Sequence, residues 1–75
     1  MSTIFDNQTL GGFLLLYREK NHLTRKMLAE KIGVNTHTIW NWEQGYSTPS
    51  VRSLNRISDV TGASFTTLFR LTKSN

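Results

Sequence analysis

Apolar residues recur every three or four positions along most of this 75-residue chain, which is the spacing of one face of an α-helix. The pattern predicts five helices, over residues 9–21, 25–32, 36–44, 50–61 and 65–71. The residues on their inward faces form the predicted core: Leu10, Phe13, Leu14, Tyr17, Leu28, Ala29, Ile32, Ile39, Trp42, Val51, Leu54, Ile57, Val60, Phe65, Leu68 and Phe69. No segment alternates between apolar and polar residues as a strand does, so we expect one all-α domain.

Cap residues define two of these helices sharply. Thr24 and Asn35 each precede a helical run and have a side-chain oxygen that can accept a bond from a free N–H of the first turn. Gly33 follows the first run and Gly45 the second, and glycine commonly ends a helix. Two short helices joined by a tight corner are typical of a helix-turn-helix, whose second helix lies in the DNA major groove.

Three features of the first and fourth helices allow more than one interpretation. Gly11 and Gly12 weaken the first helical turn, and their small size either permits close packing with another helix or marks a later helix start. Leu15 and Leu16 fall outside the inward stripe and form either the rim of a wide apolar face or a surface for self-association. Pro49 is expected to preset the start of the fourth helix.

The ends of the chain are polar and differ from the helical part. Residues 1–8 contain only two apolar residues after Met1, Ile4 and Phe5, and we expect a loosely held arm. The predicted DNA-binding domain then spans residues 9–71, and residues 72–75 form a flexible polar tail.

Composition narrows the functional class. Nine Lys and Arg against five Asp and Glu give a net charge of +4 and a pI near 10.0, which favours a polyanionic partner. The chain has no cysteine and therefore no disulfide or thiolate metal site, which fits a reducing cytoplasm. It also lacks an apolar run long enough to span a membrane and a signal-peptide pattern, so we expect a cytoplasmic protein without a membrane partner.

No residue pattern points to catalysis. The two histidines, His22 and His37, do not have the spacing of a HExxH zinc site, and no glycine-rich phosphate loop is present. We expect no enzymatic activity, no cofactor and no metal.

The stretch TRKMLAEKIGVNTHTIWNWEQG, followed by TPSVRSLNRISDVTGAS, resembles the Xre/Cro/phage-repressor family of helix-turn-helix regulators. The matching signature positions are Ala29, Gly33, Ile39, Trp42, Glu43, Gly45 and Pro49, and the resemblance runs from about residue 10 to residue 69. It implies a compact five-helix lambda-repressor-like domain, prokaryotic or phage-encoded, with the helix-turn-helix in the second and third helices. It also implies a sequence-specific transcriptional regulator that binds a double-stranded DNA operator as a homodimer.

The resemblance and the spacing together indicate the contact residues. Thr36, His37 and Asn41 match the usual base readers of the family, and residues 37 and 41 share a helical face. The candidate phosphate contacts are Arg25, Asn35, Tyr46 and Ser47. Arg25 departs from the glutamine that is common in the family, and we expect it to support the third helix less than that glutamine does.

Two structural roles follow from the resemblance and from the residues. The resemblance implies an ion pair that braces the motif, between Arg18 of the first helix and Glu43 at the end of the third. Trp42 is expected in the core, whereas Trp40 points elsewhere and either packs on the second helix or lies along the DNA backbone. The expected dimer surface is the last helix, with Phe65, Leu68, Phe69 and Leu71.

Two other functions stay open at this point. The chain fits an antitoxin-like module whose main partner is a protein and which also regulates its own gene, although no separate toxin-binding extension is apparent. It also fits the DNA-binding subunit of a larger recombination or immunity complex. The sequence indicates neither the operator nor the sign of regulation.

Overall fold

This computed structural model describes residues 9–73 of the chain. These residues contain five helices, each preceded by a polar cap residue. In chain order they are α1 (Leu10–Asn21), α2 (Arg25–Ile32), α3 (Thr36–Gln44), α4 (Val51–Thr61) and α5 (Phe65–Thr72). No strand occurs among the described residues. The predicted all-α fold is therefore confirmed.

The helix starts follow from local hydrogen bonding. In each helix the side chain of the preceding residue accepts a backbone N–H of the first turn, and these caps are Thr9, Thr24, Asn35, Ser50 and Ser64. Two helices begin one residue later than predicted, because Thr9 and Ser50 are caps and not the first helical residues. Pro49 lies directly before Ser50, the cap of α4, and so precedes the helix whose start it was expected to preset.

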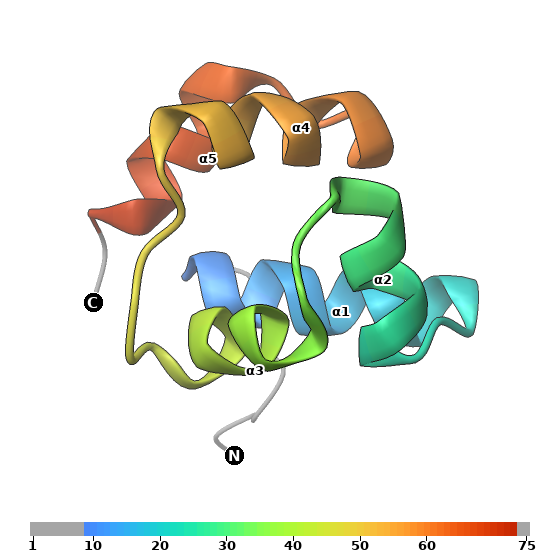
Figure 1. Cartoon of the computed structure of the whole chain (residues 1–75). Helices are drawn as coiled ribbons and strands as arrows, with labels where there is room; N and C mark the ends of the chain where they lie inside the picture. The colour runs from blue at the N-terminus through green and yellow to red at the C-terminus, as the bar shows by residue number, and fades with distance from the viewer. Residues whose placement is uncertain (1–8, 74–75) are drawn as a thin grey trace, which may run out of the picture.

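The core lies between two groups of helices. Figure 1 shows α1, α2 and α3 on one side of the core and α4 and α5 on the other; α3 packs on both α1 and α2, α4 contacts α2, and α5 contacts α1. The fully buried side chains come from all five helices: Leu14, Leu28, Ile32, Ile39, Leu54, Ile57 and Leu68. The predicted core residues Phe13, Tyr17, Val60 and Phe65 are partly buried and pack against this cluster. Leu15 and Leu16 are half-buried, as expected of the rim of an apolar face.

Four expectations for the last two helices were wrong. Val51 was predicted to be buried but is 59% exposed in the first turn of α4. Phe69 is 42% exposed, because it follows the fully buried Leu68 by one residue and therefore lies about 100° further round the helix. Leu68 cannot contribute to a dimer surface while it is buried. Helix α5 also runs to Thr72, one residue beyond the predicted end.

The predicted arm, residues 1–8, and the end of the predicted tail, residues 74–75, lie outside the described residues.

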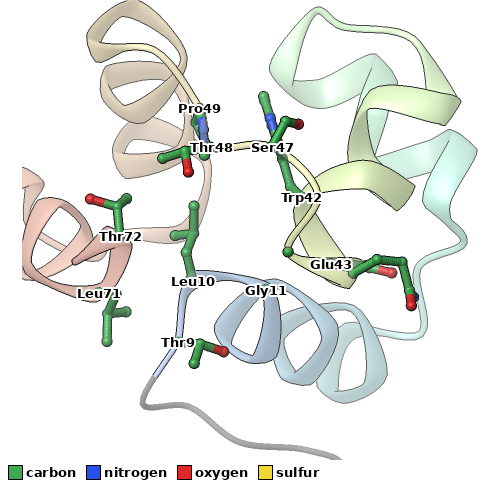
Figure 2. A pocket seen from close by; sticks show the side chains of 12 residues that line it. Thr9, Leu10, Gly11, Trp42, Glu43, Ser47, Thr48, Pro49, Leu71 and Thr72 are labelled. Atoms are coloured by element: carbon green, nitrogen blue, oxygen red, sulfur yellow. The ribbon is translucent and has the colours of Figure 1, made fainter. Parts of the chain in front are cut away.

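α1 and α3 approach each other closely at Gly11. A Cβ atom at this position would lie 2.6 Å from the carbonyl oxygen of Glu43 and 2.7 Å from that of Trp42. Figure 2 shows Gly11 on α1 beside the last turn of α3. Because α1 begins at Leu10, Gly11 is helical, and its small size serves close packing and not a later helix start.

Candidate nucleic-acid interface

The inward face of α3 sets the direction of its other side chains. Ile39 is fully buried and Trp42 is 6% exposed, so both anchor the helix on the core. Thr36 and His37 are exposed at the start of the helix, and Asn41 is half-buried one turn later. The structure thus leaves the three proposed base readers with access to solvent, and two of them lie in the first turn.

The corner before α3 is tight and is held by hydrogen bonds of Gly33 and Asn35. Gly33 has a φ of 91° and donates its N–H to the carbonyl of Ala29 at 2.8 Å. Asn35 then caps α3, and its Oδ1 accepts bonds from the N–H of Thr38 at 2.8 Å and the hydroxyl of Thr38 at 2.9 Å. The cap occupies the Asn35 oxygen, so the amide nitrogen is the group left to donate to a phosphate.

Glu43 accepts from two arginines. The Nε of Arg18 lies 2.6 Å from Oε2 of Glu43, and its Nη2 lies 3.1 Å from Oε1. The Nε of Arg25 lies 2.9 Å from the same Oε1. The Glu43 side chain is 2% exposed and that of Arg18 is 12% exposed. We call Arg18, Arg25 and Glu43 the arginine–glutamate cluster, and it connects α1, α2 and α3.

Arg25 contributes more to this cluster than the sequence indicated. We expected it to support α3 less than the family's glutamine, yet it binds Glu43 near the end of that helix. Its side chain is 38% exposed, and only its Nε is hydrogen-bonded within residues 9–73. The two terminal nitrogens therefore remain available at the N-terminus of α2, where the free N–H groups already favour an anion.

Trp40 is half-buried and makes two ring contacts within α3 and the turn that follows it. Its ring stacks on that of His37, with centroids 5.5 Å apart and an interplanar angle of 18°. The ring of Tyr46 meets Trp40 edge-on at 5.3 Å. Tyr46 is 71% exposed, and Ser47 is exposed in the turn that follows α3. The proposed phosphate contacts thus lie at both ends of α3 and at the start of α2.

A hollow of about 270 Å³ lies behind this surface, between the start of α1, the end of α3 and α5 (Figure 2). Its one ionisable lining residue is Glu43, whose carboxylate is already bound by two arginines. Within residues 9–73, no group of three His, Cys, Asp or Glu residues is placed to hold a metal ion. No helix of this part of the chain is long and apolar enough to cross a membrane.

The comparison with protein families agrees with this arrangement. A family model described as helix-turn-helix matches residues 14–68, well over half of the chain. The match runs from the middle of α1 to Leu68 in α5 and includes the whole of α2 and α3. No curated protein and no solved structure matches the chain. The protein belongs to the helix-turn-helix family of DNA-binding regulators of the Xre and phage-repressor type.

Proposed function

We propose that the protein is a sequence-specific transcriptional regulator of the Cro or repressor kind, which binds a double-stranded DNA operator with α3 in the major groove. The observation that carries the proposal is the orientation of α3: Ile39 and Trp42 fix its inner face, and polar side chains occupy the start of its outer face. A helix presented in this way fits the major groove, where each of the four base pairs exposes a different pattern of donors and acceptors.

The base readers differ in chemistry. The carboxamide of Asn41 matches the N6 and N7 of adenine, because it both accepts and donates a hydrogen bond. Thr36 can place its methyl group against the methyl group of thymine. His37 can donate a ring N–H to the O6 or N7 acceptor of guanine. These assignments rest on the position of each side chain on α3.

The phosphate contacts would set the position of the domain on the duplex. Arg25 contributes two terminal nitrogens and a full charge at the start of α2. Asn35 offers its amide nitrogen, and Tyr46 and Ser47 offer hydroxyl groups on the exposed turn after α3. The net charge of +4 favours the same partner at long range.

We further propose that the protein acts as a homodimer, because one reader helix covers only a half-site. The surface that supports pairing is on α5, where Phe65 and Phe69 stack with ring centroids 6.0 Å apart. Phe69 is exposed, and Leu71 is half-buried on the same helix.

Two variants test the assignment of roles. Asn41→Ala should lower discrimination at one operator position by about 1–3 kcal/mol and leave binding to scrambled DNA nearly unchanged. Arg25→Ala should weaken binding to every sequence and reduce the slope of log K against log salt by roughly one. Both effects are measured by equilibrium binding across a salt series. The two DNA ligands are an operator obtained by selection from random DNA and a scrambled sequence.

Lys20→Ala is the control for the loss of charge, since Lys20 is exposed on α1 outside the helix-turn-helix. It should change the salt slope less than Arg25→Ala does. Equal weakening of operator and scrambled DNA by Asn41→Ala would show that α3 does not read the bases.

A further inference from the structure

We propose that Trp40 is a positioning residue for base readout, which holds the imidazole of His37 in one orientation on the outer side of α3. The inference rests on the proposed function, because it assumes that His37 faces a base pair. We refer to His37, Trp40 and Tyr46 as the aromatic ladder.

The geometry of the ladder is that of two successive ring contacts. His37 and Trp40 are three residues apart and therefore lie on neighbouring turns of the helix surface. Their rings are nearly parallel, at 18°, with centroids 5.5 Å apart. The ring of Tyr46 meets that of Trp40 at 5.3 Å and 63°, close to the edge-to-face arrangement that aromatic pairs favour. Trp40 thus contacts two rings.

The far end of the ladder is fixed by the way α3 ends. Gly45 has a φ of 81°, and its N–H donates to the carbonyl of Trp42 at 3.2 Å. The N–H of Tyr46 donates to the carbonyl of Asn41 at 2.9 Å. These two bonds form a Schellman motif, which turns the chain back and brings the residue after the glycine against the helix. Tyr46 is therefore attached to α3 by its backbone as well as by its ring.

The stacked arrangement suits a hydrogen-bond donor. Contact with Trp40 covers one face of the imidazole, whereas both ring nitrogens lie at the edge of the ring and donate or accept in its plane. His37 is otherwise exposed, so without this contact its side chain would sample several rotamers. The ladder orders the ring before DNA arrives, and ordering a side chain on binding is a cost that lowers affinity.

Through its contact with His37, Trp40 should affect base discrimination although it contacts no base itself. A ring held in one orientation meets the acceptor of the correct base at good geometry and meets other bases poorly. Discrimination at the base pair of His37 should therefore depend on Trp40, whereas discrimination at the base pair of Asn41 should not.

The binding test compares Trp40→Ala, Trp40→Phe and His37→Ala on the selected operator and on its single-base-pair variants. Trp40→Ala should reduce discrimination at the His37 position by about 2- to 10-fold, the range expected for one aromatic contact. Trp40→Phe should restore most of it, since a ring remains. Adding Trp40→Ala to His37→Ala should cause no further loss at that position.

Tyr46 offers a matched pair of controls. Tyr46→Phe keeps the ring of the ladder and removes the hydroxyl proposed to contact phosphate, so discrimination at the His37 position should persist. Tyr46→Ala removes the support of Trp40 and should lower that discrimination in the direction of Trp40→Ala. The base pair read by Asn41 is the internal control in every variant.

A readout without DNA separates the ladder from the proposed function. In proton NMR, the ring current of Trp40 should shift the imidazole protons of His37 upfield in the parent, and this shift should be lost in Trp40→Ala and partly retained in Trp40→Phe. Unchanged His37 shifts in Trp40→Ala would overturn the inference, as would unchanged or uniformly reduced discrimination. A parent with no sequence preference would overturn both the proposed function and the inference, although the upfield shift would persist.

Discussion

His22 ends α1 in a conformation that normally belongs to glycine. Its φ and ψ are 57° and 44°, and it is the one residue other than glycine with positive φ among the described residues. The N–H groups of His22 and Leu23 donate to the carbonyls of Glu19 and Arg18, which completes a helix-ending motif. A residue with a Cβ atom is strained by roughly 1–2 kcal/mol in this region.

Replacing His22 should therefore increase stability. We expect His22→Gly to raise the free energy of unfolding by about 0.5–1 kcal/mol, because relief of strain exceeds the greater freedom of glycine in the unfolded chain. Urea denaturation measures the change, which corresponds to an increase in Tm of a few degrees. His22→Ala is the control and should change stability little, since it keeps the Cβ atom. A less stable glycine variant would contradict this account.

For single residues, the sequence predicted the features that depend only on residues nearby in the chain. Thr24 and Asn35 were identified as caps because capping needs only a side-chain oxygen and the next few N–H groups. Val51 was misplaced because periodicity does not show how far neighbouring helices extend to cover a side chain. Phe69 was misplaced because it was assigned to the same face as its neighbour Leu68.

At the scale of the helices, the arginine–glutamate cluster joins α1, α2 and α3. One buried carboxylate receives a guanidinium from α1 and another from α2, so α3 is bound to both helices near its C-terminal end. The resemblance to known regulators implied the pair of Arg18 and Glu43. It did not imply the bond from Arg25, which depends on how α2 and α3 cross and cannot be derived from residues 18 positions apart.

The two arginines should differ in their effect on stability. Arg18→Ala should lower the free energy of unfolding by about 3 kcal/mol, the low end for breaking a buried pair, because Arg25 remains beside Glu43. It also removes the bond from Arg18 to the carbonyl of Leu23. Arg25→Ala should cost about 1 kcal/mol or less, since its side chain is 38% exposed.

Urea denaturation without DNA measures both variants under the same conditions. If Arg18→Ala unfolds at the same urea concentration as the parent, the cluster does not brace α3. The same result for Arg25→Ala would leave Arg25 with a role in DNA binding alone.

At the scale of the whole molecule, we proposed one reader helix, α3, within residues 9–73, and we expect assembly on DNA to follow from this. We expect a DNA footprint with two half-sites whose centres are about 34 Å apart, one turn of the duplex. Phe69→Glu should weaken binding to the paired site and leave binding to an isolated half-site nearly unchanged, because a charge on the exposed part of α5 opposes pairing. A footprint of one unpaired half-site of about five base pairs would exclude the homodimer.

The close approach at Gly11 has a consequence for how the regulator can change its target. The contact joins the start of α1 to two carbonyl groups of α3, so part of the docking of α3 depends on main-chain atoms. Main-chain atoms are common to every sequence, and substitutions at Thr36, His37 and Asn41 leave that contact unaltered. We therefore expect that new operators become accessible by exchanging the side chains at positions 36, 37 and 41 while the contact at Gly11 stays the same. Engineering of altered specificity should start with these residues and keep Gly11 fixed.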